Sequence, residues 1–365
     1  MKTLKALLRI LFVATHLLVI VLFLLAAYSD KISPEKSMFM AFVGLAFPIL
    51  GVLNGCFSMV WLFVKRWNYF LVGLVSFFLC WGAVGRYFPF HATAEIPEEN
   101  TLKILTYNVM AFGNKAHTAQ EPNKIVEYIA SSDADIVCLQ EYAVVRSGRG
   151  LTSESLFKAL KMYPFRSVIR INQRGAQTNG LAVFSKYPIS NSKKINYESN
   201  YNGSSVHEIN VNGKKLILIN NHLESFKLTS KDKSQYASVF RNLDSESLGE
   251  LRGPILHKLS DAFRIRAKQA EAVAQKIENT KGDYMLVCGD FNDTPISYTH
   301  HVIQGDLIDA FAASGRGMGA TYNQNFFWFR IDNILHSSNM QSFNCKVDKV
   351  KYSDHYPVWC YLQLQ

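Results

Sequence analysis

Charged residues are scarce in the first quarter of this chain, and three stretches of it contain none at all. These stretches are residues 10–29, 37–64 and 67–85. A bilayer core about 30 Å thick needs about 20 apolar residues of helix to cross it, so each stretch is long enough to span. The lack of a polar face excludes buried helices of a soluble domain, and we predict three transmembrane helices.

The first apolar stretch has the alternative of being a cleaved secretory signal, because Lys2, Lys5 and Arg9 precede it. It is longer than a usual signal core and two further apolar stretches follow, so we interpret it as a span. Lys65 and Arg66 fill the second connection, and basic residues favour the cytoplasmic side. Three crossings of an inner membrane then make a multi-pass protein whose C-terminal domain is extracytoplasmic.

The chain also contains few cysteines, and fewer acidic than basic residues. The six cysteines include no Cys-x-x-Cys pair, so a zinc or thioredoxin-like site has no support. Cys345 and Cys360 could pair across adjacent strands, but we expect buried free thiols. The net charge is +10, and residues 101–365, with 31 basic and 24 acidic residues, carry +7 of it. A basic domain is compatible with an anionic substrate or membrane surface.

The rest of the chain is predicted to be a linker followed by one globular domain. Residues 1–90 would be the membrane anchor, residues 91–100 a polar linker and residues 101–365 the globular domain. Because helices interrupt a sheet-rich chain instead of alternating with strands, the pattern favours an α+β sandwich over a doubly wound sheet. Helices are predicted at residues 122–131 and 262–278, and Asn212-Gly213 predicts a hairpin turn. Strands are predicted at residues 102–109, 136–140, 181–185, 206–211, 216–220, 285–288, 333–336, 345–350 and 358–364.

Polar residues gather directly after, or within, these apolar strands. Strand ends that meet at one rim of a sandwich would bring such groups into a single cleft. The residues concerned are Asn108, Glu141, Asn221, His222, Asp290, Asn292, Asp332, Asp354 and His355.

Six short blocks around these residues carry a resemblance to a known family. They are T-Y-N-V at 106–109, L-Q-E at 139–141, N-H-L at 221–223, G-D-F-N at 289–292, R-I-D at 330–332 and S-D-H-Y-P-V at 353–358. In this order they resemble the endonuclease/exonuclease/phosphatase superfamily, the deoxyribonuclease-I-like group, over roughly residues 101–365. The resemblance implies a four-layered α/β sandwich of the α+β class, with two packed mixed sheets flanked by helices. It also implies divalent-metal-dependent hydrolysis of a phosphoester by an activated water.

The resemblance predicts a site for Mg²⁺ or Mn²⁺. Glu141 is expected to be the principal ligand, Asn108 to supply an amide oxygen, and Asp354 to contact the ion directly or through water. Hard cations prefer few carboxylates, an amide oxygen and retained waters, and this set agrees with that preference. A buried structural carboxylate is the alternative for Glu141.

The resemblance also predicts the catalytic groups. Asp290 is expected to orient and deprotonate the attacking water, and Asn292 to hold the nucleophile or a phosphate oxygen. An Asx-turn at Asp290 is a second, compatible explanation. His355 and His222 are expected to stabilise charge on the phosphoryl oxygens or to assist the leaving group. Asp332 would hold His355 charged and oriented.

Two features concern the surroundings of this predicted site. No clear second glutamate follows the L-Q-E block to pair with His222, and Glu154 is the nearest. Asn179, Arg146 and Arg149 are predicted to contact the substrate. Ordinary solvated loop residues are the alternative for the two arginines.

The substrate class stays open at the level of sequence, because one fold serves many reactions. The superfamily includes nucleases, inositol-polyphosphate phosphatases and sphingomyelinases. The expected partners are therefore a nucleic acid, phospholipid or inositol phosphate, together with the lipid bilayer. A non-catalytic membrane-bound binding module is the competing class, and missing metal or base residues would mark it. Each main position is filled in this chain.

One long segment, residues 226–263, has little regular pattern. Uncommitted loops longer than about 12–15 residues tend to be functional or disordered. It mixes basic and apolar residues and follows His222 closely. We interpret it as a lid or membrane-facing ridge over the active site, with a disordered insertion as the alternative.

Overall fold

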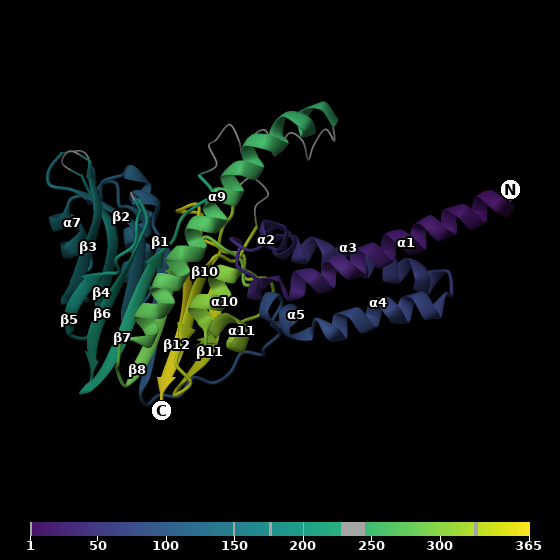
Figure 1. Cartoon of the computed structure of the whole chain (residues 1–365). Coiled ribbons are helices and arrows are strands. Elements are labelled where there is room, and N and C mark those ends of the chain that lie inside the picture. Colours follow the sequence, from purple (N-terminus) through teal and green to yellow (C-terminus); the bar gives the residue numbers. More distant parts are fainter. Residues whose placement is uncertain (1, 149, 175–176, 200, 228–244, 325–327) are drawn as a thin grey trace.

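The structure is a computed structural model and describes residues 2–148, 150–174, 177–199, 201–227, 245–324 and 328–365. Figure 1 shows a body of two sheets from which a bundle of N-terminal helices projects. The N-terminus lies at the end of the bundle that is remote from the body, and the C-terminus lies on the body.

The body contains two six-stranded sheets. In the first sheet the order is β11-β12-β1-β2-β4-β3, and in the second it is β5-β6-β7-β8-β10-β9. Each sheet is mixed, because β1 pairs with β2 and β7 with β8 in parallel whereas the other pairs are antiparallel. The first sheet comprises β1 (Thr101–Asn108), β2 (Ile136–Val145), β3 (Phe165–Arg174), β4 (Gln177–Ser185), β11 (Met340–Val347) and β12 (Val358–Leu364). The second comprises β5 (Ile189–Lys194), β6 (Gly203–Val211), β7 (Lys214–His222), β8 (Tyr284–Asp290), β9 (Ile308–Asp309) and β10 (Asp332–His336).

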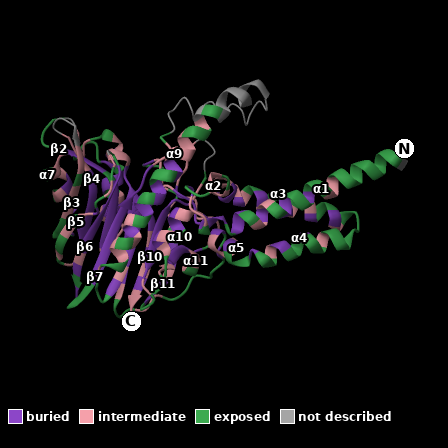
Figure 2. Ribbon diagram, viewed as in Figure 1, coloured by how far each residue is buried: buried purple, intermediate pink, exposed green. Residues whose placement is uncertain are grey.

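The central strands β1, β7 and β8 bury both of their faces, which explains their nearly continuous apolar sequences. On β1, Ile104 packs into the core between the two sheets, whereas Leu105 packs under the helices on the outer side. The outer face of the first sheet is covered by α6 (Lys124–Ser131) and α7 (Ser153–Ala159). The outer face of the second is covered by α9 (Ser245–Glu278) and α10 (Tyr298–Gln304). The predicted sandwich of two packed mixed sheets flanked by helices is confirmed (Figure 2).

Most predicted strands are present. The main errors of the prediction concern edge strands of the two sheets and the start of one helix. The edge strands β3 and β5 were not predicted, because solvent-facing edge strands carry polar residues and no apolar run. The expectation that residues 226–263 lack regular structure is wrong for their second half, because α9 begins at Ser245. Residues 228–244 of the proposed lid lie outside the described residues. Cys345 and Cys360 are buried free thiols, as expected.

The N-terminal region consists of α1 (Lys2–Ala27), the short η1 (Ser29–Lys31), α2 (Met38–Leu45), α3 (Phe47–Phe63), α4 (Trp67–Leu79) and α5 (Trp81–Tyr87). Only α1 is long and apolar enough by itself to cross a membrane, among the helices that the structure describes. The count rises to three if the pairs α2/α3, bent by 59°, and α4/α5, bent by 68°, are single spans. The second and third predicted helices are thus each broken. Pro48 is the second residue of α3 and cannot donate the backbone hydrogen bond that would continue α2.

The helical bundle docks on the body through α2, η1 and α5. Arg86 of α5 forms a 2.7 Å ion pair with the buried Asp30 of η1. The backbone carbonyl of Arg86 accepts a 2.7 Å hydrogen bond from Arg330 of the body. Gly44 of α2 approaches the body so closely that an added Cβ would lie 3.0 Å from the carbonyl oxygen of Ile296. The same body loop contains the G-D-F-N block, so the anchor packs beside the predicted active site.

Candidate active site

The register of the second sheet gathers three predicted site residues at one rim. Asp290 ends β8 and pairs with His222 at the end of β7 and with Asp332 at the start of β10. Gly289 has φ 124°, and an added Cβ there would lie 2.1 Å from the carbonyl oxygen of Asn221. Only glycine allows this backbone approach, which explains why it precedes the aspartate.

Asn108 connects the two sheets at this rim. It ends β1, and its Nδ2 donates hydrogen bonds to Asp290 Oδ2 at 3.0 Å and to Glu141 Oε1 at 3.2 Å. Its Oδ1 accepts from the backbone N–H of Met110. Glu141 sits in an irregularity of β2 with φ 49°, and its side chain is 41% exposed. Such a bulge re-aims a side chain, and here it directs the carboxylate into the cleft.

Asp290 is buried and firmly held. Its Oδ1 accepts from the backbone N–H of Asn292 at 2.8 Å, and its Oδ2 accepts from Asn292 Nδ2 at 3.1 Å. Burial raises the pKa of this carboxyl to about 6, although the nearby His355 partly offsets that rise. Asn292 Nδ2 also donates to the Leu223 carbonyl at 2.9 Å. In this arrangement Asn292 positions Asp290, and its amide hydrogens are already engaged.

His355 and Asp332 form the predicted carboxylate–histidine pair. His355 Nδ1 lies 2.8 Å from Asp332 Oδ2, and His355 Nε2 lies 3.7 Å from Asp290 Oδ2. Burial lowers the pKa of this imidazole, but Asp332 and Asp290 raise it more, so the pKa stands well above its ordinary value. Ser353 Oγ accepts from the His355 backbone N–H and donates to the Asn108 carbonyl. These contacts hold the ring beside the aspartate, and the neighbouring carboxylates favour its protonated form.

His222 faces the same carboxylates from β7. Its Nε2 lies 3.7 Å from Glu141 Oε1 and 3.9 Å from Asp290 Oδ2. Asn202 Nδ2 lies 3.4 Å from the same nitrogen. The acidic neighbours of His222 are therefore two residues of the site itself, and neither is Glu154 of α7.

The donor chemistry of the rim fits a divalent cation. Asp354 lines the same cavity as Glu141, and Asn108 contacts Glu141 through Nδ2, with its amide oxygen turned to the Met110 N–H. The Asn108 amide would therefore have to turn over to present its oxygen to an ion beside Glu141. Carboxylate and amide oxygens are the ligands that Mg²⁺ and Mn²⁺ prefer. Among the described residues, the acidic and histidine groups close enough to share an ion are Asp290, Asp332 and His355, whose ligand atoms lie within 4.8 Å of one another. The ligands predicted from the sequence, Glu141, Asn108 and Asp354, thus lie next to this second group of possible ligands.

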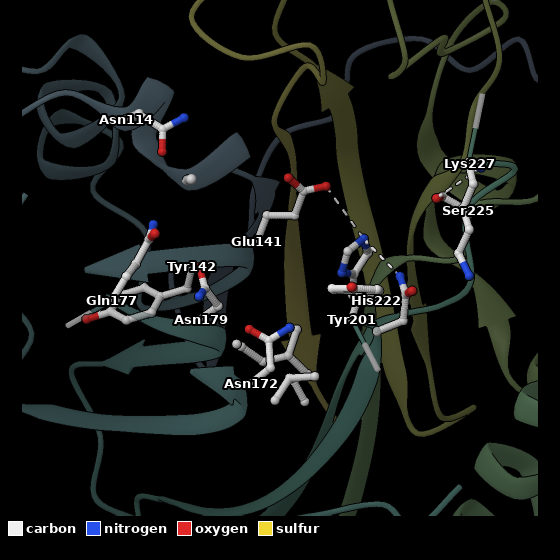
Figure 3. A pocket seen from close by; sticks show the side chains of 15 residues that line it. Asn114, Glu141, Tyr142, Asn172, Gln177, Asn179, Tyr201, His222, Ser225 and Lys227 are labelled. Carbon is white, nitrogen blue, oxygen red and sulfur yellow. Dashed lines mark hydrogen bonds and ion pairs between the residues drawn. The ribbon is translucent and has the colours of Figure 1, made fainter. Parts of the chain in front are cut away.

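Two cavities meet at Glu141 and His222. We name the first the apolar cavity: it has about 390 Å³, contains Asp290, Asp354 and His355, and has walls from α2, α3 and α9. We name the second the polar cavity: it has about 510 Å³, and its lining mixes apolar residues with five amide side chains, Asn114, Asn172, Gln177, Asn179 and Asn202. Figure 3 shows the second cavity, with the His222 ring facing the Glu141 carboxylate.

The three residues predicted to contact the substrate differ in where they lie. Asn179 of β4 lines the polar cavity. Arg146 follows β2 as an exposed residue and is not among the residues that line either cavity, and Arg149 lies outside the described part of the chain. Sequence reasoning missed Asn202, which contacts His222, and Tyr322, whose ring packs edge-on against His355 with 5.1 Å between ring centroids. Both lie in loops without a strand pattern or a motif to mark them.

Comparisons with known proteins agree with this geometry. The sequence model described as the Endonuclease/Exonuclease/phosphatase family matches residues 105–355. A second model, a domain of unknown function, matches residues 8–87. The chain is 25% identical over 244 residues to mouse 2',5'-phosphodiesterase 12 and 26% identical over 242 residues to the rat protein, covering 60% and 59% of this chain. The match spans 38% of the length of each of these curated relatives.

Solved structures share the fold. The human Nocturnin catalytic domain with bound sulfate anion is similar with a TM-score of 0.52 and 16% sequence identity, covering 75% of this chain and 98% of that one. At this identity the likeness concerns the arrangement of the sheets and helices.

Proposed function

Because this chain belongs to the endonuclease/exonuclease/phosphatase family, we propose that it hydrolyses phosphodiester bonds with Mg²⁺ or Mn²⁺ at a membrane-tethered active site. Members of this family are phosphoester hydrolases. The observation that carries the proposal is the convergence of Glu141, Asp290 and His355 in one cavity. The name of the mouse and rat relatives supports a diester as the bond that is cleaved.

In this mechanism Asp290 orients the attacking water and accepts its proton. With a pKa of about 6 the carboxyl is mostly ionised at neutral pH, yet basic enough to take a proton in the transition state. Asn292 fixes the carboxylate in place through its two hydrogen bonds to Asp290. The negative charge that grows on the phosphoryl oxygens is stabilised by His355, which Asp332 holds protonated.

The remaining groups act on the other side of the phosphate. His222 lies beside Glu141 and donates a hydrogen bond to the departing oxygen. A divalent ion held by Glu141 and Asn108, with Asp354 close by, would withdraw charge from the phosphoryl group. Glu141 is half-exposed at the mouth of the cleft, so it can take up such an ion from solution.

We further propose the anchor that the sequence predicts. Residues 1–90 would form three membrane spans in an inner membrane, residues 91–100 a linker and residues 101–365 the catalytic domain. Support comes from α1, which is long enough to span, and from the apolar side chains exposed along α1, α3 and α4.

The test uses the full-length protein in lipid nanodiscs with bis(p-nitrophenyl) phosphate as substrate. We expect Mg²⁺-dependent release of p-nitrophenol, and a fall in kcat of about 10³-fold for Asp290→Asn and for Glu141→Gln. Asp133→Asn is the matched control, because this exposed carboxylate precedes β2 at the end of the sheet opposite the site. Full activity in excess chelator, or in either site variant, would overturn the mechanism.

A further inference from the structure

The apolar cavity has a wall that belongs to the membrane anchor. Phe42 and Leu45 of α2 and Ile49 of α3 line the same empty volume as Asp290 and His355. Hydrolysis of a phosphodiester by itself requires no apolar wall. A ligand group in this cavity would therefore contact hydrocarbon side chains from a predicted membrane span.

This wall is fixed in place by packing. The Phe42 ring meets the Phe263 ring of α9 edge-on, with 5.6 Å between ring centroids. Glu35, just before α2, forms a 3.2 Å ion pair with Lys268 of α9. Together with the close approach of Gly44 to the body, these contacts place α2 at the side of the cleft.

The wall also continues onto the outer surface of the bundle. Ile49 lines the cavity and is 58% exposed, and Val52, one turn further along α3, is 65% exposed. On the opposite side of the cavity, Ile255 and Leu259 of α9 add apolar surface. An apolar chain can thus pass from the lipid-facing side of α3 to the scissile phosphate while staying in contact with hydrocarbon.

The polar cavity on the other side of Glu141 has different chemistry. Asn172, Gln177 and Asn179 lie together beside Glu141 (Figure 3). Asn179 Nδ2 is buried and has no hydrogen-bond partner within the described part of the chain, so it is available to a ligand. Amide groups donate and accept hydrogen bonds without charge, and Glu141 is the one carboxylate that lines this cavity in the described residues. This lining suits an uncharged, hydroxyl-bearing group and offers no separate counter-charge to a cationic one.

Within the described residues, the two cavities offer few lysines and arginines to a long polyanion. Lys227 is the one lysine or arginine among the described residues that line them, and it is paired with Glu224. Nucleic acids gain much of their affinity from several phosphate contacts by lysine and arginine. A substrate with one phosphodiester needs no such row of cations.

From these observations, which rest on the proposed phosphodiesterase function, we propose that the substrate is a membrane lipid phosphodiester with an uncharged, hydroxyl-bearing headgroup. The headgroup occupies the polar cavity, the phosphate lies between Glu141 and His355, and the apolar chain lies along α2 and α3. Water forms a new P–O bond as one P–O ester bond breaks. The departing oxygen takes up the proton that the water loses, so the products are one alcohol and one phosphomonoester.

The test compares substrates on the full-length protein in proteoliposomes with Mg²⁺. The probes are phosphatidylglycerol and phosphatidylcholine vesicles, a single-stranded DNA 20-mer and bis(p-nitrophenyl) phosphate, with products identified by mass spectrometry. We expect phosphatidylglycerol to be cleaved at least about tenfold faster than phosphatidylcholine or DNA, a difference of about 1.4 kcal/mol in barrier. Ile49→Asn should lower the ratio of phosphatidylglycerol to chromogenic diester turnover about tenfold. Asn179→Leu should lower the preference for phosphatidylglycerol over phosphatidylcholine.

Val72→Asn is the matched control, because Val72 is exposed on α4, away from the proposed lipid path, and is not among the residues that line either cavity. It should leave both ratios unchanged. If the chromogenic diester is cleaved but DNA is cut faster than either lipid, the lipid proposal fails and the phosphodiesterase function stands. Equal effects of Ile49→Asn and Val72→Asn would also reject the lipid path along α3. If no diester is cleaved, the proposed function itself fails.

Discussion

At the scale of single residues, the charge of His355 depends on the carboxylates around a buried ring. In Asp332→Asn the 2.8 Å partner of Nδ1 loses its charge, so the pKa of His355 should fall toward its ordinary value. We expect kcat to fall about 10²-fold at neutral pH, and the loss to grow as the pH rises from 6 to 8, because the imidazole then loses its proton. A pH–rate profile measures this effect. Asp306→Asn, which changes an exposed carboxylate, should have the profile of the wild type.

His207 provides a second residue-scale prediction, on stability. It is buried between Ser192 and Ser205, and burial lowers its pKa to about 4. In the unfolded chain His207 takes up a proton near pH 6.5, whereas in the folded chain it does so only near pH 4. The free energy of unfolding therefore falls as the pH drops through this interval. The loss should reach about 3 kcal/mol, and His207→Gln should remove this part of the pH dependence.

Thermal unfolding at pH 7.5 and pH 4.5 measures the difference, with His301→Gln as an exposed control. An unchanged pH dependence in His207→Gln would show that other groups cause it.

At the scale of elements, α9 holds the G-D-F-N loop through one buried arginine. Arg266 Nε pairs with Asp293 at 3.2 Å, and Nη1 donates to the Glu224 carbonyl at 2.8 Å. Its guanidinium also packs 4.3 Å from the centre of the Phe226 ring. α9 thereby connects the segments that follow β7 and β8, which carry His222 and Asp290.

Arg266→Met should destabilise the protein by about 3–5 kcal/mol, because it leaves the Asp293 carboxylate buried without its cation. Arg266→Met combined with Asp293→Asn should recover part of the loss, because the unpaired charge is gone. Thermal unfolding of the two variants measures this. Arg264→Met, on the exposed side of the same helix, is the control. A double variant that is less stable than the single one would contradict the ion-pair explanation.

At the scale of the whole molecule, the charges of the bundle predict an orientation for the proposed membrane anchor. Lys65 and Arg66 join α3 to α4 at the end remote from the body, the same end as the N-terminus (Figure 1). Basic residues favour the cytoplasmic side, so the body should lie outside the cytoplasm. An alkaline phosphatase fused after Gln365 should therefore be active, and a reporter that works only in the cytoplasm should be inactive there. The reverse pair of results would place the active site inside the cell.

Most strands of this protein could be predicted from its sequence, whereas some contacts in its cleft could not. Residues 358–364 were predicted as a strand with the bounds that β12 has, because a buried strand needs a continuous apolar run. The turn at Asn212-Gly213 could also be predicted, because the hairpin turn needs positive φ and Asn-Gly is the pair that adopts it readily. Both residues have positive φ in the structure. Asn202 was not predicted, because its contact with His222 depends on where a loop packs.

By itself, the sequence determined the apolar stretches, the positions of most strands along the chain and the polar residues at their ends. Hydrophobic pattern and turn chemistry are local properties, and they can be read from neighbouring residues. The tertiary structure alone decided that Asn108 contacts Asp290, 182 residues further along the chain. It also decided that Phe42 and Ile49 of the anchor line the cavity of Asp290 and His355. Such contacts arise when separate elements pack together, and no local pattern records which surfaces will meet.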